Sequence, residues 1–171
     1  MHPEAPATSW PAQAIVTGRG HGTPLRLSEP LSFWGGYDAQ QGHIVEAGHP
    51  QHGARLAGRV MLMERAKGSS SSSSVLAEAI RNGTGPAAIV MRERDLIVGL
   101  GCIVASELYG QHVPVVVVDE TAWQALLDLG DAEPCELHID ATEPGHCLIR
   151  SVARTAHNGS PSTSSAPGDK T

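Results

Sequence analysis

The sequence is poor in basic residues and in cysteine, and each shortage excludes a class of function. The chain of 171 residues has 12 lysines and arginines against 18 aspartates and glutamates, a net charge of −6. This charge argues against a nucleic-acid binder. The 3 cysteines include no Cys-x-x-Cys pair, so we expect reduced thiols in a cytoplasmic protein. They predict neither a disulfide framework nor a complete metal or iron–sulfur site within this chain.

Long apolar segments are also missing. No stretch reaches the roughly 18 uninterrupted apolar residues of a membrane-spanning helix, so we expect no membrane partner. The first residues, MHPEAPATSWPAQ, lack a basic region followed by an apolar run, which argues against a secretory signal. Both ends have a proline-rich or serine-rich composition that buries too little surface to fold. We therefore predict disordered tails over residues 1–12 and 154–171 and one folded domain over residues 13–153.

The predicted domain alternates strands and helices through its middle. Apolar segments between glycines and prolines predict strands over 13–18, 24–33, 58–63, 86–91 and 113–118. Helical periodicity and stop signals predict helices over 74–83, 95–110 and 119–130. Residues 135–140 and 146–152 predict a closing hairpin. The central β-α-β-α-β-α order implies a parallel sheet with covering helices, so the predicted fold class is α/β in a β/β/α arrangement with flanking β segments.

A run of six serines, Ser69 to Ser74, stands in the stretch KGSSSSSSVLAEAIRNG. Its composition fits a flexible linker, but its place between a strand and a helix favours a tight β-α turn. In that turn Gly68 would allow an unusual backbone angle, and a serine within 71–73 would cap the helix. The helix N-terminus, together with Lys67 and Arg65, would favour a carboxylate or a phosphate. The Gly-x-x-x-x-Gly-Lys-Ser/Thr pattern of a P-loop is missing.

Two other clusters leave structural and functional interpretations open. Three of the six aromatic residues lie within Phe33 to Tyr37, either as a small satellite core or as part of a functional face. Three histidines follow in a predicted loop at irregular spacing, without a nearby cysteine; they are His43, His49 and His52. We interpret them as solvated loop residues rather than metal ligands, and Cys102 as a small core residue.

Three stretches together resemble the small swivelling domain of the aconitase X family: EPLSFWGGYDAQQGHI, KGSSSSSSVLAEAIRNGTGPAAIVMRE and VGLGCIVASELYGQHVPVVVVD. They occur in the family's order and spacing. The resemblance runs from about Ile15 to Leu129, with a weaker continuation to Val152. It implies a swivelling β/β/α domain, in agreement with the alternating pattern. In the family this domain is fused to a large domain or made as a separate small subunit, and without a large domain here the resemblance implies a small subunit.

The resemblance also implies which residues act. The family's catalytic serine follows a basic residue and a glycine, which here are Lys67 and Gly68 before Ser69. Ser69 would be the base that removes the proton next to the substrate carboxylate. Lys67, Gly68 and Ser70 are the expected substrate contacts around it, while Lys67 could equally be a solvated surface charge.

At two positions the sequence differs from the family pattern, and a second motif also matches the family. Ala66 stands where the family usually has a further glycine, and Ser71 stands where aconitase proper has an arginine. Carboxylate binding would then depend on Lys67, on Arg65, on backbone N–H groups or on a partner. The stretch LSFWGG would place Ser32, Gly35 and Gly36 at the face that meets the large subunit and the substrate.

The implied function is that of a hydro-lyase subunit, active with a large partner subunit that carries the iron–sulfur cluster. The first expected substrate is cis-3-hydroxy-L-proline, which would be dehydrated to Δ1-pyrroline-2-carboxylate; the second is 5-phosphomevalonate. An alternative of another class is a non-catalytic swivelling binding module. That module would need a phosphorylatable histidine in a structured turn, and none of the nine histidines has a convincing flank for one.

Overall fold

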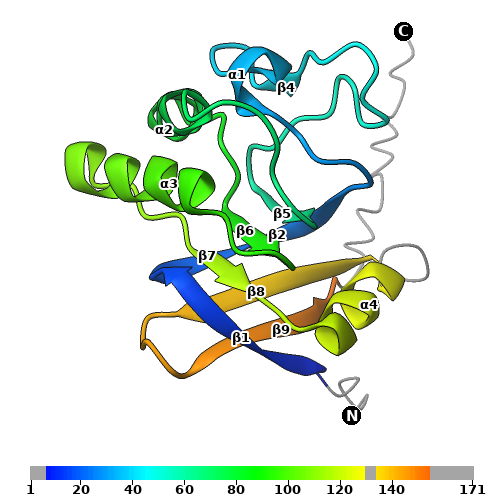
Figure 1. Ribbon diagram of the computed structural model, residues 1–171. Helices are drawn as coiled ribbons and strands as arrows, with labels where there is room; N and C mark the ends of the chain where they lie inside the picture. Colours follow the sequence, from blue (N-terminus) through cyan, green and yellow to red (C-terminus); the bar gives the residue numbers. More distant parts are fainter. Residues whose placement is uncertain (1–6, 130–133, 155–171) are drawn as a thin grey trace, which may run out of the picture.

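The computed structural model describes residues 7–129 and 134–154 of the chain (Figure 1). Its strands are β1 (Ser9–Val16), β2 (Gly18–Leu27), β3 (Tyr37–Asp38), β4 (His43–Ile44), β5 (Arg59–Met63), β6 (Ala88–Met91), β7 (Val115–Val117), β8 (Cys135–Ala141) and β9 (Cys147–Ala153). Its helices are α1 (Phe33–Gly36), α2 (Ser72–Arg81), α3 (Leu96–Tyr109) and α4 (Glu120–Asp128). The predicted α/β class is confirmed, with helices α2 and α3 side by side over the parallel strands.

Seven of these strands form a closed barrel in the order β1-β7-β6-β5-β2-β8-β9, and β3 and β4 pair in a separate two-stranded sheet. Strands β5, β6 and β7 are parallel neighbours, as the central alternation predicts. Strand β2 also pairs in parallel with β5, which the sequence did not predict. Strands β8 and β9 form the expected antiparallel hairpin, and β8 pairs with β2. Strand β1 closes the barrel, because its first half pairs with β9 and its second half with β7. Closure was not predicted from the sequence.

The predicted disordered tail over residues 1–12 is wrong for its last four residues. Ser9 to Ala12 pair in register with β9, from Ser9 opposite Arg150 to Ala12 opposite Cys147. The side chains of Trp10 and Ala12 pack against the buried cluster inside the barrel. Proline content indicated disorder, but the apolar contacts and the strand partner outweigh it. The tail predictions for residues 1–6 and 155–171 lie outside the described residues.

The predicted strand over 24–33 also ends early. Strand β2 stops at Leu27, and residues 33–36 form a turn in which Trp34 and Gly35 have the backbone angles of a type II β-turn. Gly35 occupies the position of that turn that requires a positive φ, and its φ is 76°. This turn explains the first glycine of LSFWGG.

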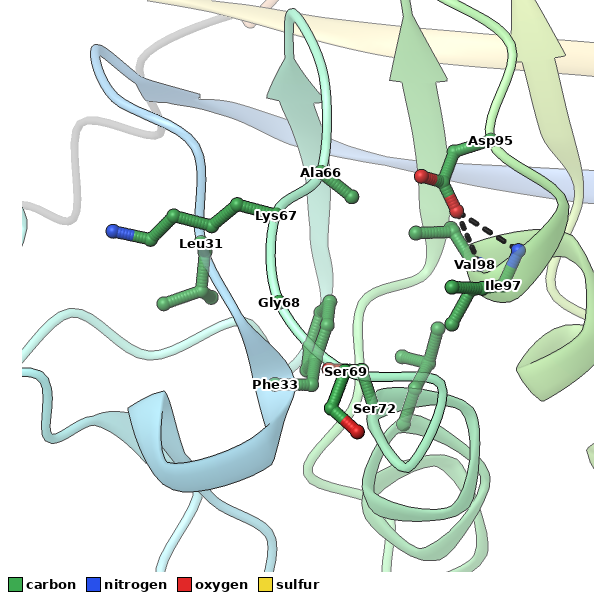
Figure 2. Close-up of a pocket in the computed structure, with 11 residues that line it drawn as sticks. Leu31, Phe33, Ala66, Lys67, Gly68, Ser69, Ser72, Asp95, Ile97 and Val98 are labelled. Atoms are coloured by element: carbon green, nitrogen blue, oxygen red, sulfur yellow. Dashed lines mark hydrogen bonds between the residues drawn. The ribbon is translucent and has the colours of Figure 1, made fainter.

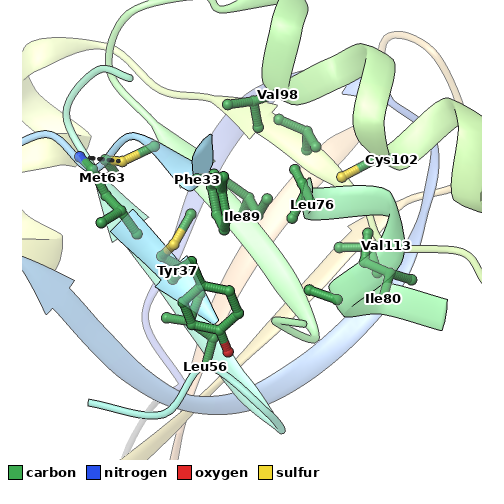
Figure 3. Close-up of a cluster of buried hydrophobic side chains, with 14 of the residues drawn as sticks. Phe33, Tyr37, Leu56, Met63, Leu76, Ile80, Ile89, Val98, Cys102 and Val113 are labelled. Carbon is green, nitrogen blue, oxygen red and sulfur yellow. Dashed lines mark hydrogen bonds between the residues drawn. The ribbon is translucent and has the colours of Figure 1, made fainter. Parts of the chain in front are cut away.

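Alternate residues of the parallel strands enter two different cores. Val60, Leu62 and Val90 belong to a cluster with Leu137 and Ile149 inside the barrel. Their sequence neighbours face the helices instead, in a second cluster that includes Met61, Met63, Ile89, Leu76 and Cys102 (Figure 3). Because side chains alternate across a strand, this explains why β5 and β6 are apolar at nearly every position.

The two glycines inside α3 permit close packing, as predicted. A Cβ added at Gly101 would lie 2.8 Å from the carbonyl oxygen of Ser73 in α2, and one at Gly99 would lie 2.9 Å from Ile15. Helix α3 is 14 residues long. None of the helices in the described ranges is long and apolar enough to cross a membrane.

Candidate active site

The segments that follow β2, β5 and β6 meet at one edge of the barrel. These strands are parallel neighbours, so their carboxyl ends lie together, and ligands of open α/β sheets bind at that edge. A pocket of about 100 Å³ lies there (Figure 2). It is lined by Leu31 and Phe33 after β2, by residues 66–69 and by Ser72 and Leu76 of α2 after β5, and by Asp95, Ile97 and Val98 after β6. The predicted Lys67, Gly68 and Ser69 are therefore brought together.

The serine run is a β-α connection, as its position predicts. Ser71 is the N-cap residue of α2, inside the expected range, but its own hydroxyl makes no capping hydrogen bond. The hydroxyl oxygen of Ser69 accepts the N–H of Ser71 at 3.2 Å, and the carbonyl of Ser69 accepts the N–H of Ser72 at 3.0 Å. Ser70 is exposed, and its carbonyl oxygen accepts a hydrogen bond from the Ser73 hydroxyl at 2.8 Å.

Three backbone N–H groups stay available at the start of α2. Within the described ranges, those of Gly68, Ser69 and Ser70 donate to no protein acceptor. They belong to exposed residues just before the helix, where the helix dipole favours negative charge. The turn can therefore offer donors to a carboxylate or an oxyanion.

Ser72 holds the two sequence motifs together. It is 6% exposed, and its hydroxyl oxygen accepts the N–H of Trp34 at 3.1 Å. The same oxygen lies 3.4 Å from the hydroxyl of Ser32, which donates to the carbonyl of Trp34 at 2.9 Å. The sequence did not single out Ser72, because a run of identical residues does not reveal which one is buried.

Gly68 fits against Ser32 because it has no side chain. Its φ is 99°, and a Cβ added there would lie 2.1 Å from the hydroxyl oxygen of Ser32 and 2.7 Å from its Cβ. Any other residue would collide with Ser32 and would also adopt a strained backbone angle. Gly68 thus permits the close approach of the two motifs.

Lys67 pairs with a carboxylate that the sequence did not indicate. Its ammonium lies 2.6 Å from Glu46 Oε1, and Figure 2 shows it extending past Leu31, away from Asp95. The other carboxylate oxygen of Glu46 is buried without a hydrogen-bond partner within the described ranges. The backbone N–H of Glu46 donates to the carbonyl oxygen of Gly36 at 3.3 Å. Glu46 therefore joins two predicted site residues and offsets the charge of Lys67.

Asp95 is the second residue that sequence reasoning missed. Its side chain caps α3 by accepting the N–H groups of Ile97 and Val98, both at 2.9 Å. Asp95 comes after β6 in the chain, just as Ser69 comes after β5. Because the carboxyl ends of parallel strands lie together, its position in the sequence could have indicated a place near Ser69. The pocket thus combines a serine, a carboxylate and free N–H groups over an apolar floor that includes Phe33. Pockets that enclose a whole small ligand measure about 300–1,000 Å³, so this smaller one can enclose only part of such a ligand.

The cysteines do not fit an iron–sulfur cluster. Cys102 is buried in α3, and burial raises the pKa of its thiol to about 12, whereas cluster ligands are thiolates. Cys147 is buried and Cys135 is half-buried, at opposite ends of the β8–β9 hairpin. The prediction that Cys102 is a core residue is confirmed.

The interpretation of the loop histidines as solvated is wrong for His49. It is 4% exposed, its Nε2 donates to the Glu29 carbonyl at 3.0 Å, and its Nδ1 accepts the N–H of Gln51 at 3.1 Å. His49 therefore stabilises the loop after β4. The irregular spacing gave no sign of this burial.

Comparisons with known proteins agree on one family. A family model described as the aconitase X swivel domain matches residues 9–143. The cis-3-hydroxy-L-proline dehydratase of Pseudomonas aeruginosa is 40% identical over 136 residues, which are 77% of this chain and 23% of that enzyme. The phosphomevalonate dehydratase small subunit of Methanothermobacter thermautotrophicus is 34% identical over 131 residues, which are 77% of this chain and 92% of that subunit. The chain thus spans about a quarter of the first relative and nearly all of the second.

A solved structure has the same fold. The crystal structure of Thermococcus kodakaraensis aconitase X in its holo form matches with a TM-score of 0.68 at 25% sequence identity. The match covers 85% of this chain and 98% of that one.

Proposed function

Because the chain belongs to the aconitase X family as its swivel domain, we propose that it is the small subunit of a hydro-lyase whose active site a large subunit completes. The observation that carries this proposal is the pocket beside Ser69. It has the volume of part of a substrate and lies where three strand ends meet. The match over 92% of a protein named as a small subunit also supports an enzyme made of a small and a large subunit.

The reaction would be the loss of water from a small hydroxy acid. Ser69 in its alkoxide form would take the proton from the carbon next to the carboxylate, and the C–O bond of the neighbouring carbon would break to release hydroxide. The hydroxide would become water by taking up the proton that Ser69 gained, directly or through solvent, which restores the alkoxide. The free N–H groups of Gly68, Ser69 and Ser70 would stabilise the developing negative charge. This role of Ser69 rests on its place in the pocket and on the family motif.

We propose cis-3-hydroxy-L-proline as the substrate, with Δ1-pyrroline-2-carboxylate as the product. The relative with this activity in its name is 40% identical. A second candidate is 5-phosphomevalonate, supported by the coverage of the phosphomevalonate dehydratase small subunit. Its phosphate would need basic groups, and the only basic residue in the described pocket lining is Lys67, which pairs with Glu46. Within the half of the site that this chain supplies, the charge of the pocket therefore favours the hydroxyproline.

The test is an assay of the assembled enzyme. The full chain would be produced together with the large subunit and mixed with each hydroxy acid, and the products would be identified by mass spectrometry. Formation of Δ1-pyrroline-2-carboxylate would support the first substrate, and dehydration of 5-phosphomevalonate would support the second. An assembled, iron-loaded complex that dehydrates neither would contradict the proposal.

The iron–sulfur cluster that the family relationship suggests is proposed to lie in the large subunit, since the thiols of this chain do not fit one. The isolated chain should be colourless and should contain less than about one iron per ten chains after anaerobic reconstitution with iron and sulfide. The assembled complex should be brown. Iron analysis and absorbance near 400 nm measure both. Stoichiometric iron in the isolated chain would contradict this assignment.

The exposed face of α3 is proposed as the docking surface for the large subunit. Leu96, Leu100 and Ile103 are 68%, 50% and 44% exposed, and their spacing of four and three residues places them on one helix face. Ile97 and Val98 of the same helix line the pocket. The apolar face is therefore continuous with the site that the partner would complete, as expected of an interface core.

Leu100→Asp should weaken the complex at least about tenfold, because a charge would replace an apolar side chain at the centre of the contact. The dissociation constant can be measured by calorimetry with the purified large subunit. Leu148→Asp is the matched control, since Leu148 is 41% exposed on β9 and should leave the dissociation constant unchanged. Equal weakening by both variants would exclude α3 as the specific docking surface.

A further inference from the structure

Two histidines and a glutamate gather on the antiparallel wall of the barrel. His21 of β2 lies directly opposite His138 of β8, and their rings stack with centroids 5.1 Å apart. Glu136 precedes His138 by two residues on the same strand, so the two share a face. The Nδ1 atom of His21 lies 2.6 Å from Glu136 Oε1, and the Nε2 atom of His138 lies 4.0 Å from Glu136 Oε2. None of the three lines the pocket beside Ser69.

The three side chains are accessible, and their ligand atoms lie close together. They offer one ligand atom each, and these atoms lie within 4.8 Å of one another. Their side chains are 66%, 31% and 43% exposed for His21, Glu136 and His138, so an ion can enter from solvent. Glu136 accepts a hydrogen bond from His21 and lies near His138, so its carboxylate already stands between the two imidazoles.

Basic residues lie near the cluster, but Glu136 contacts the two histidines rather than an arginine. Arg19 pairs with Asp140 at 3.4 Å rather than with Glu136. Arg150 lies opposite His138 in the β8–β9 pairing, and Arg154 is close enough to contribute to the low pKa of Glu136. These positive charges reduce the attraction for any cation. They disfavour Mg²⁺ and Ca²⁺, which depend on several oxygen ligands, more than an ion that binds imidazole.

We propose that His21, Glu136 and His138 form a binding site for a divalent first-row transition-metal ion of the Zn²⁺ type. Two imidazole nitrogens and one carboxylate oxygen are a ligand set that Zn²⁺ uses at about 2.0–2.2 Å, with water in the fourth position. Such bonds place ligand atoms roughly 3.3 Å apart, and rotation of exposed side chains brings the three atoms to that separation. The ion replaces the hydrogen bond between His21 and Glu136.

The position of the site indicates what the ion does. Strand β2 pairs in parallel with β5 and antiparallel with β8, so it joins the two halves of the barrel. An ion held by β2 and β8 fastens this junction. The effect is stabilisation of the fold, which can be measured without enzymatic activity and independently of the proposed function.

The experiment uses the full chain without an affinity tag, stripped with chelator and titrated with ZnCl₂ and, separately, with MgCl₂. We expect one Zn²⁺ per chain with a dissociation constant below about 10 μM, and a rise in melting temperature on the order of 5 °C at saturating Zn²⁺. Mg²⁺ at the same concentrations should give no heat of binding in a calorimetric titration and should leave the melting temperature unchanged. No Zn²⁺ binding at 100 μM protein, or equal binding of Mg²⁺, would overturn the proposal.

Variants identify the ligands. His138→Gln and Glu136→Gln should each weaken Zn²⁺ at least about tenfold, because removing a ligand costs at least as much as removing a group that only supports one. His146→Gln is the control, since His146 is an exposed histidine in the β8–β9 turn outside the cluster. Both cluster variants keep a polar side chain on an exposed face, so their melting temperatures without metal should stay near that of the parent chain. Unchanged Zn²⁺ affinity in both, or equal weakening by His146→Gln, would place the ion elsewhere.

Discussion

Ser69→Ala should lower the dehydration rate of the assembled enzyme by about 10²–10⁴, the usual contribution of a general base. The change removes one hydroxyl from an exposed residue that lines the pocket. Because the base acts in the transition state, kcat should fall while KM changes little. The hydroxyl also accepts the N–H of Ser71, so the free energy of unfolding should drop by only about 0.5–1 kcal/mol. Steady-state kinetics and chemical denaturation measure the two effects.

Ser74→Ala is the matched control for this variant. Ser74 is exposed in the first turn of α2, and its hydroxyl makes no hydrogen bond within the described ranges. Both variants replace serine with alanine in the same run, at positions five residues apart. We expect the kcat of Ser69→Ala to be at least a hundredfold lower than that of Ser74→Ala. Similar turnover in both would mean that the run serves only as a turn and that another group, with Asp95 the first candidate, removes the proton.

Gly68→Ala should disturb both stability and activity. A methyl group at this position meets the hydroxyl of Ser32 and adopts a φ of 99°. Strain of this kind costs about 1–3 kcal/mol, and relief of the collision would move the turn that holds Ser69. We expect the free energy of unfolding to fall by about 2–4 kcal/mol, with the strain and the collision adding. We also expect turnover to fall at least about tenfold, since a small displacement of Ser69, the proposed base, would be costly.

Two further variants separate strain from collision. Gly53→Ala imposes a φ of 83° on alanine in open space, so it should show the strain alone and leave turnover intact. Adding Ser32→Gly to Gly68→Ala removes both atoms that the new methyl group meets, and should restore part of the stability. Ser32→Ala should restore less, because its Cβ would still lie 2.7 Å from the added one. If Gly68→Ala behaves like Gly53→Ala, the close approach to Ser32 has no role.

The elements with strong local signals were predictable from the sequence. Helix α3 begins at a capping aspartate and ends at Gly110 in a left-handed conformation, and such end signals act within a few residues of the chain. Strands β5 and β6 are buried on both faces, so continuous apolar runs revealed them. The turn before α2 was predictable because a strand and a helix on either side left little room for a linker.

The features that were missed depend on residues far apart in the chain. Strand β1 gains its stability from β7 and β9, more than 90 residues away, and its own composition contains no sign of them. The Glu46 partner of Lys67 and the second lining carboxylate Asp95 come from other loops. The pairing of His21 with His138 requires the register of β2 and β8. A sequence pattern reports local preference, whereas these contacts follow from closure of the barrel.

The pairing of β1 with β9 brings the start and the end of the described fold together. The N–H of Ser151 donates to the carbonyl of Thr8 at 2.9 Å, so the chain enters and leaves the barrel at neighbouring points. A polypeptide joined before β1 or after β9 would therefore be anchored at nearly the same place. Attachment at either end would therefore leave the Ser69 turn in the same orientation relative to the attached polypeptide. This shared anchor point offers a geometric reason why the Pseudomonas enzyme, of which the match covers 23%, and the Methanothermobacter small subunit, of which the match covers 92%, can contain the same domain.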